Sequence, residues 1–159
     1  MSIEMKQQIC LNGHQISYGV NPETVTNEFC STCGKTVISE CQECQSNIFG
    51  YLSEDFMYEL AGGGIRVPKY CKHCSNPYPW TKKSLDAASE LIALSDLNQQ
   101  EKDDFNESIP DLISDTPKTK VAMVKFKKYS VKAGAVVASS LRELLVDVAS
   151  EATIKALKI

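Results

Sequence analysis

The sequence predicts a small β module held together by bound metal, followed by an all-α C-terminal region that ends in a long helix. Two observations predict this division: all seven cysteines lie between residues 10 and 74, and helix-forming residues dominate after residue 81. A chain of 159 residues, 43% of them hydrophobic, suffices for one ordinary domain or two small modules. We therefore expect a metal-binding module over residues 1–80 and a helical region over residues 81–159.

The cysteines and one histidine form four pairs with the spacing of metal ligands. Three pairs are Cys-x-x-Cys motifs, and in the fourth the imidazole of His14 completes an odd set of seven thiols. A two-residue gap lets a tight turn bring two sulfur atoms to one metal ion at about 2.3 Å. Eight ligands make two tetrahedral zinc sites per chain. Joining the pairs in sequence order gives site 1 (Cys10, His14, Cys30 and Cys33) and site 2 (Cys41, Cys44, Cys71 and Cys74).

Other arrangements stay open at this stage. A cross-brace would join the first pair to the third, but the seven residues 34–40 between the second and third pairs favour the sequential form. Disulfides are disfavoured, because seven cysteines cannot all pair within one chain and no export signal is visible. An iron–sulfur cluster or a redox-active Cys-x-x-Cys is a further alternative. His73 could replace one ligand, although an exposed or partly packed position is favoured for it.

The residues around these pairs resemble known bacterial proteins. Phe29-Cys-Ser-Thr-Cys-Gly34, Cys41-Gln-Glu-Cys44 and Ile48-Phe-Gly50 are similar to a double zinc ribbon. Cys10-Leu-Asn-Gly-His14, the segment from Tyr70 to Thr81 and the helical tail resemble the bacterial domain of unknown function 2321 over most of the chain. This resemblance implies tandem zinc ribbons and a helical C-terminal half, and it implies no activity. Ser75 departs from the glycine that usually follows such a motif.

Short strands and one short helix are predicted for the metal-binding module. Ser53, followed by two acidic residues, is typical of a helix start, and the triple glycine at residues 62–64 would end that helix. The triple glycine is not expected to bind phosphate, because no Lys-Ser/Thr pair follows it. The residue pattern predicts strands at residues 15–20, 28–29, 36–38, 48–51 and 65–67.

The segment Pro77-Tyr-Pro-Trp80 is unusual because prolines hold two aromatic rings in a stiff, extended stretch. A module with little core needs aromatic side chains to cover its metal-binding turns. Tyr78 and Trp80 could therefore pack the module against the helices, or they could form a partner-binding face.

Four helices are predicted for the C-terminal region. Thr81 or Ser84 could cap the first helix, the segment 98–101 has the form of a capping box, and Pro110 suits the first position of another helix. The last pattern contains no further proline, and we expect a bend or break near Gly134. The predicted bounds are about 82–94, 99–108, 110–114 and 117–157.

The last helical pattern carries a heptad-like apolar stripe. A short tail offers few partners of its own to so long a helix, so the stripe predicts self-association, with a dimer favoured; packing on the chain's own shorter helices is the alternative. The stripe consists of Val131, Ala138, Leu141, Leu145, Val148, Ala152 and Ile159, widened by Leu144 and Ala149.

Charge is segregated within a chain whose net charge is −3. Residues 96–115 hold seven acids and one lysine, whereas residues 118–132 hold six lysines and no acid. The two segments could pair within the chain or between subunits, each exposed contact contributing little. Alternatively, Lys125, Lys127 and Lys128 could contact phosphate groups, so binding to nucleic acid is the alternative function.

No catalytic arrangement is visible. Four protein ligands would fill each metal site, whereas a catalytic zinc keeps one position open. Nucleophile-elbow, kinase and dinucleotide-binding motifs are not found. The sequence predicts a non-catalytic zinc-binding adaptor with an unknown protein partner. The uncharged run at residues 133–141 is too short to span a membrane, and without a secretory signal we expect a cytoplasmic setting.

Overall fold

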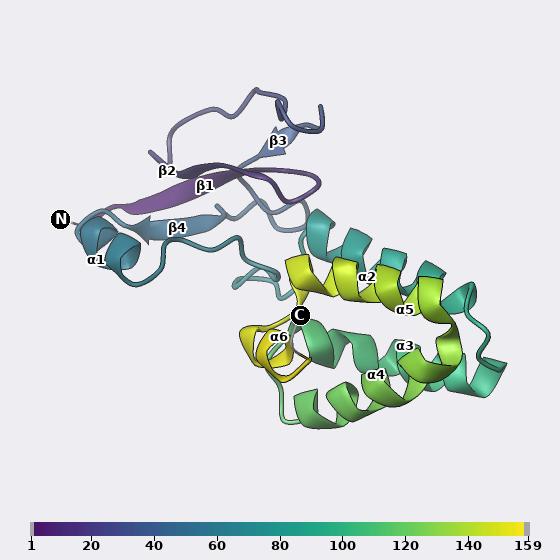
Figure 1. Ribbon diagram of the computed structural model, residues 1–159. Coiled ribbons are helices and arrows are strands. Elements are labelled where there is room, and N and C mark those ends of the chain that lie inside the picture. Colours follow the sequence, from purple (N-terminus) through teal and green to yellow (C-terminus); the bar gives the residue numbers. More distant parts are fainter. Residues whose placement is uncertain (1, 158–159) are drawn as a thin grey trace. The chain divides into compact units, whose positions relative to one another are not determined.

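The chain folds into two compact units, which meet in sequence between Lys82 and Lys83 (Figure 1). The computed structural model describes residues 2–157. Among these residues, the N-terminal unit contains a small antiparallel sheet and one short helix, and the C-terminal unit is helical. The order of the elements is therefore the predicted one, with β structure around the cysteines followed by helices.

Strand β1 is the centre of the sheet. Lys6 pairs with both β2 and β4, and Ile9 pairs with both β2 and β3, so β3 and β4 share one edge of β1 while β2 occupies the other. Because β1 has neighbours on both edges, its residues 6–10 are all buried. The strands are β1 (Glu4–Cys10), β2 (Gln15–Val20), β3 (Val37–Ile38) and β4 (Phe49–Leu52).

Strand β1 has no counterpart among the predicted strands, because its buried residues include Lys6, Gln7 and Gln8. Polar residues hide the apolar alternation that identifies a strand. Their burial is compensated by hydrogen bonds: the Gln7 side-chain amide donates to the carbonyl oxygens of Phe49 (2.9 Å) and Arg66 (3.0 Å). Buried amides thus attach two distant segments to the central strand.

The other short elements follow the predictions unevenly. Strands form at 15–20, 37–38 and 49–52, close to the predicted bounds, but residues 65–67 form no strand. Phe29 makes only a single bridge, to Thr36. Helix α1 (Phe56–Ala61) begins later than predicted, because Ser53 instead uses its hydroxyl to accept the backbone N–H of Ile3 (3.0 Å). The helix ends at the triple glycine, as predicted.

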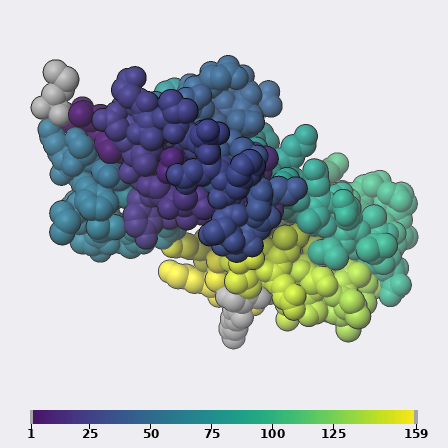
Figure 2. Space-filling view, turned by 90° about the horizontal axis from the view of Figure 1, so that it is seen from above, coloured from purple at the N-terminus to yellow at the C-terminus, as the bar shows by residue number. Residues whose placement is uncertain are grey.

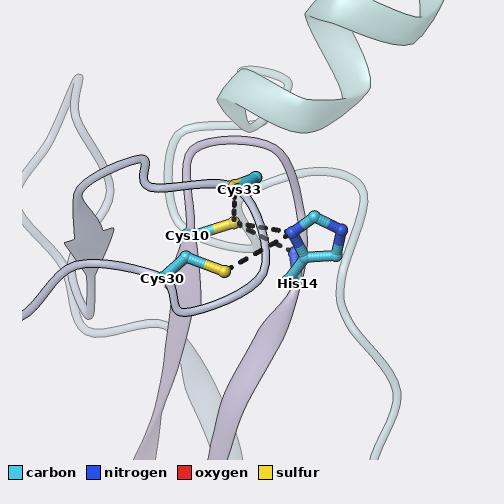
Figure 3. Close-up of side chains that lie close together, drawn as sticks. All are labelled: Cys10, His14, Cys30 and Cys33. Atoms are coloured by element: carbon cyan, nitrogen blue, oxygen red, sulfur yellow. Dashed lines mark hydrogen bonds between the residues drawn. The ribbon is translucent and has the colours of Figure 1, made fainter.

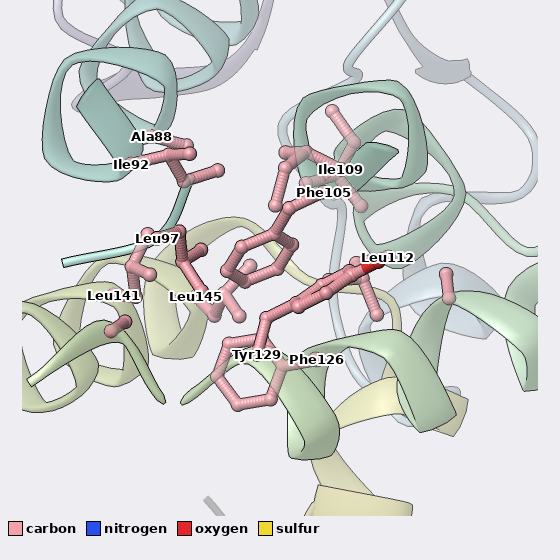
Figure 4. Close-up of a cluster of buried hydrophobic side chains, with 13 residues drawn as sticks. Ala88, Ile92, Leu97, Phe105, Ile109, Leu112, Phe126, Tyr129, Leu141 and Leu145 are labelled. Carbon is pink, nitrogen blue, oxygen red and sulfur yellow. The ribbon is translucent and has the colours of Figure 1, made fainter. Parts of the chain in front are cut away.

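The C-terminal unit packs its helices around one apolar core. Side chains from α2, α3, α4 and α5 converge on Phe105, which is fully buried (Figure 4). Phe126 meets Phe105 edge-on, with ring centroids 6.1 Å apart. The helices are α2 (Pro79–Ala93), α3 (Gln99–Ile113), α4 (Thr119–Ala133), α5 (Ala135–Val148) and α6 (Glu151–Leu157).

The capping box at the start of α3 is confirmed. The Asn98 side chain accepts the backbone N–H of Glu101 (2.9 Å), and the Glu101 carboxylate accepts the backbone N–H of Asn98 (3.2 Å). The prediction of separate helices at 99–108 and 110–114 is wrong, because Pro110 lies inside α3. The last turn of α3 holds despite the missing proline N–H, since Leu112 and Ile113 anchor it in the core.

The single long helix at 117–157 is also wrong, because the segment forms α4, α5 and α6. Gly134 has a φ of +96°, which ends α4 at the place where a break was expected. A second, unpredicted break follows α5: Ala149 is extended, and the Ser150 hydroxyl accepts the backbone N–H of Thr153 (3.3 Å) at the start of α6. No helix within residues 2–157 is both long and apolar enough to cross a membrane.

The breaks fold the central part of the predicted apolar stripe back onto the chain's own core, whereas Val131 stays 86% exposed. Leu141 and Leu145 are completely buried, and Val148, Leu144 and Ala149 pack against the same cluster. This outcome matches the intramolecular alternative, so the stripe no longer supports a dimer. Ile159 lies outside the described residues.

Candidate metal centres

The donor atoms of site 1 come from two turns of the N-terminal unit (Figure 3). Cys10 ends β1, and the tight turn before β2 brings His14 back toward it. In this turn Gly13 donates its N–H to the carbonyl oxygen of Cys10 (2.9 Å), and His14 donates its N–H to Cys10 Sγ (3.3 Å). The second turn supplies Cys30 and Cys33, so that three sulfur atoms and one imidazole face a common point.

Site 2 is assembled from two Cys-x-x-Cys turns that lie far apart in the sequence. Cys41 and Cys44 come from the loop before β4, and Cys71 and Cys74 come from the turn before α2. The structure therefore groups the eight residues in sequence order, not as a cross-brace. His73 is exposed and belongs to neither group.

The three Cys-x-x-Cys turns share one backbone pattern. In each, the first cysteine donates its N–H to the carbonyl oxygen five residues later, and its own carbonyl accepts the N–H four residues later, all at 2.8–2.9 Å. The residue after the second cysteine has a positive φ: 74° at Gly34, 59° at Gln45 and 62° at Ser75. Sequence reasoning identified this need at Gly34 and overlooked Gln45, which the repetition of the motif would have revealed.

The distances within each group fit a tetrahedral zinc site. Cys10 Sγ lies 3.7 Å from Cys33 Sγ, and Cys41 to Cys74 and Cys44 to Cys71 are also 3.7 Å apart. Zinc–sulfur bonds of about 2.3 Å imply sulfur–sulfur edges of about 3.8 Å in a tetrahedron. His14 Nδ1 lies 3.3 Å from Cys10 Sγ. All seven cysteines are free thiols, so the disulfide alternative is wrong, and each group could hold a metal ion.

A protein-family match covers nearly the whole chain. The family, described as "Uncharacterized protein conserved in bacteria (DUF2321)", matches residues 3–157. The chain belongs to the DUF2321 family. The resemblance seen in the sequence is thereby confirmed. Searches of curated proteins and of solved structures find no match to the chain.

Within the DUF2321 chain, backbone N–H groups favour the ionised thiols of Cys30 and Cys71. Burial raises the pKa of Cys30, but the N–H groups of Cys33 and Thr32 outweigh it and lower that pKa to about 6. Burial is likewise outweighed at Cys71, where the N–H groups of Cys74 and His73 lower the pKa to about 6. At Cys41 burial prevails and raises the pKa to about 11. A cation between the sulfur atoms would stabilise all of them as thiolates.

The two sites differ in how they are covered. Site 2 lies in an apolar cluster with Ile9, Ile48, Tyr78 and Trp80. The cluster around site 1 has only Val37 as an apolar neighbour besides the cysteines, and the His14 side chain is exposed. Solvent therefore reaches site 1 more easily than site 2.

The structure contradicts the prediction that Tyr78 and Trp80 form a partner-binding face. Both side chains are buried in the N-terminal unit, where their rings stack at 4.8 Å and the Trp80 indole donates to the Pro68 carbonyl oxygen (2.8 Å). Trp80 also lies against the site 1 turn, because a Cβ added to Gly13 would come within 2.9 Å of Trp80 Cβ. One indole thus supports both metal centres of the DUF2321 protein.

The lysines of α4 partly pair with the acids of α3. Lys125 Nζ lies 2.6 Å from Asp104, and Lys132 Nζ lies 2.7 Å from Glu101. The Lys125 hydrogen bond, together with one donated by the Tyr129 hydroxyl, lowers the pKa of Asp104. Lys127 and Lys128 are exposed. The segregated charges therefore meet within the C-terminal unit, as one of the two interpretations of the sequence expected.

Proposed function

We propose that both groups hold structural zinc ions and that the protein is a non-catalytic interaction module. The observation that carries this proposal is the 3.7 Å spacing of the sulfur atoms in two complete sets of four donors. Four thiolates, or three thiolates and an imidazole, are the donor sets of structural zinc. Unpaired thiols of this kind also need a reducing compartment, so we propose a cytoplasmic setting.

The zinc ions would replace a core that the N-terminal unit lacks. Its buried apolar residues besides cysteine are few, and those nearest the metal centres are Ile9, Ile48, Val37, Tyr78 and Trp80. Structural zinc contributes on the order of 10–16 kcal/mol to folding, more than such a core provides. The metal would therefore fix the turns and everything attached to them.

Native mass spectrometry of the full chain tests the metal assignment. We expect two zinc ions per chain, and we expect His14→Ala and Cys44→Ser each to weaken one of them. His73→Ala is the matched control, because His73 is exposed and belongs to neither group. One ion or none in the wild-type chain, or iron instead of zinc, would contradict the proposal.

Four protein ligands leave no position for a substrate, so we infer that the metal takes no part in catalysis. Cobalt can replace zinc, and its absorption spectrum reports the ligands directly. Added cyanide or azide should leave the spectrum of the cobalt-loaded chain unchanged. A shift of the bands at low ligand concentration would indicate an open coordination position and would favour an enzyme.

The interaction role is supported by apolar side chains displayed beside site 1. Phe29, which immediately precedes Cys30, is 73% exposed, and Val25 in the same loop is 85% exposed. Atoms from the loop between β2 and β3 are open to view in the space-filling picture (Figure 2).

In-cell crosslinking with a Phe29→Asp variant tests this interaction role. A protein partner captured by the wild type and lost by this variant, with zinc content unchanged, is the expected result; unchanged capture contradicts it.

Binding to nucleic acid is the second candidate, favoured by the exposure of Lys127 and Lys128. Lys125 would first have to leave Asp104. The titration of a labelled duplex at low salt separates the candidates, since phosphate contacts weaken steeply as salt rises. Salt-dependent binding that Lys127→Gln and Lys128→Gln reduce would favour this candidate, and no binding at low salt would remove it.

A further inference from the structure

A set of exposed valines lies along two consecutive helices of the C-terminal unit. Val121, Val124 and Val131 of α4 and Val136 and Val146 of α5 are between 50% and 86% exposed. A single exposed valine needs no explanation. Valine is, however, a weak helix former, because its branched side chain loses rotamer freedom in a helix. Five of them on two joined helices indicate a surface that is covered by something.

The spacing of these residues is that of a helix-packing seam. In α4, Val121, Val124, Lys128 and Val131 follow intervals of three, four and three residues, the pattern of a and d positions. In α5, Val136, Glu143 and Val146 follow intervals of seven and three residues, which fit the same pattern. These positions lie opposite the buried faces of the two helices. We call the five valines the valine face.

Charges beside the valines differ in sign between the two helices. Lys120, Lys127 and Lys128 are exposed on α4, which contains no acidic residue. Exposed Glu143 and Asp147 accompany Val136 and Val146 on α5, whose only base is Arg142. The yellow-green atoms of α5 are open to view in Figure 2. The outer surface of α4 thus complements the outer surface of α5.

We propose that the valine face binds a second copy of this chain, with α4 of each protomer lying along α5 of its partner. A two-fold axis produces this contact twice, so lysines meet carboxylates in both halves. Packing α4 on α4 would instead oppose lysine with lysine. The proposal names one partner within the interaction role proposed above, and it requires no metal. A monomer would therefore refute it without affecting the zinc result.

The size of the face sets the expected affinity. A contact two helices wide falls at the low end of specific interfaces, about 1,200 Å² in total. Such interfaces give reversible association, so we expect a dissociation constant in the micromolar range.

Sedimentation equilibrium of the full, zinc-loaded chain measures this association. The wild type should dimerise, and Val124→Asp combined with Val131→Asp should weaken the dimer at least about 100-fold, because two buried carboxylates would face the acidic surface of α5. Met57→Lys, at an apolar residue of α1 in the N-terminal unit that is 74% exposed, is the control and should leave the dimer unchanged. A wild-type monomer at high micromolar concentration, or a dimer unaffected by the double substitution, overturns the proposal.

Charge reversal tests the pairing of α4 with α5. One variant carries Lys127→Glu and Lys128→Glu, and the other carries Glu143→Lys and Asp147→Lys. Each alone opposes like charges and should dimerise at least about tenfold more weakly than the wild type. An equimolar mixture restores opposite charges in both contacts and should form heterodimers. Circular dichroism confirms folding, and failure of the mixture to associate would refute this arrangement.

Discussion

The two units of the chain are held together by different means. The C-terminal unit buries a continuous apolar cluster around Phe105, Phe126, Leu141 and Leu145, and it contains no cysteine. The N-terminal unit surrounds two groups of metal-ligating residues with small clusters. The stability of the N-terminal unit should therefore depend on bound ions and reduced thiols, whereas the stability of the C-terminal unit should depend on apolar packing alone.

Removing metal gives the largest expected effect. Excess chelator should unfold residues 2–82 and leave residues 83–157 folded, because zinc contributes on the order of 10 kcal/mol or more to a site of this kind. Hydrogen exchange followed by mass spectrometry resolves the two units. Loss of protection in both units, or in neither, would show that they do not differ in the proposed way.

Truncating the core of the C-terminal unit is the converse test. Phe105→Ala should destabilise that unit by about 3–5 kcal/mol, because it removes a fully buried ring and leaves a cavity. Leu94→Ala, at an apolar residue of the same unit that is 77% exposed and lies outside the valine face, is the control and should have little effect. Urea denaturation measures both variants, and the zinc content should stay at two ions per chain. Loss of zinc from Phe105→Ala would indicate that the units are coupled.

Two glycines in the turns of site 1 should differ in how much an added Cβ weakens zinc binding. Gly13 has a φ of +92°, and an added Cβ would collide with Trp80, so Gly13→Ala should weaken site 1 by about 2–3 kcal/mol. Gly34 also has a positive φ, but an added Cβ would meet nothing within 4 Å, so Gly34→Ala should carry only the backbone strain of about 1–2 kcal/mol. Zinc competition measures both, and equal losses would argue against the role of Trp80.

The metal centres were more predictable from the sequence than the strands around them. Ligand spacing is local: a two-residue gap and Gly34 are sufficient to define a turn that presents two sulfur atoms. Strand β1 was missed because Lys6, Gln7 and Gln8 are buried only through hydrogen bonds and neighbours supplied by distant segments. The covering role of Trp80 depends likewise on the turn at Gly13, far away in the sequence.

The predicted helix boundaries in the C-terminal region were wrong for a related reason. The spacing of apolar residues indicates which residues share a helix face. The same spacing can continue through a break between two helices when both helices pack on the same core. Leu141 and Leu145 therefore looked like a seam for a partner, although they fold back onto Phe105 and its neighbours. Gly134 marked the first break, whereas Ala149 and Ser150 carry no comparably strong signal.

Acid should affect the C-terminal unit through its ion pairs. The Lys125 hydrogen bond holds the pKa of Asp104 below its ordinary value, so Asp104 contributes stability at neutral pH. That contribution is complete above about pH 4 and is lost as pH falls through the lowered pKa. Asp104→Asn should therefore lower stability at pH 7 and reduce its dependence on pH below 4. Hydrogen exchange of residues 83–157 measures this, and an unchanged pH profile would contradict the role of Asp104.

The smallest expected effect is a gain in the N-terminal unit. Ser75 holds a φ of +62° with a side chain, in the position that Gly34 occupies in the equivalent turn of site 1. Relief of this strain, partly offset by the greater freedom of glycine in the unfolded chain, should make Ser75→Gly more stable by about 0.5–1 kcal/mol. Gln42→Gly, in a turn of the same site but without a positive φ, should give no gain. Zinc competition can detect a severalfold difference. A gain at Ser75 would show that the free energy of zinc binding offsets local backbone strain in the N-terminal unit. The apolar core around Phe105 has no single interaction of comparable strength. No gain would mean that Ser75 adopts its positive φ without strain.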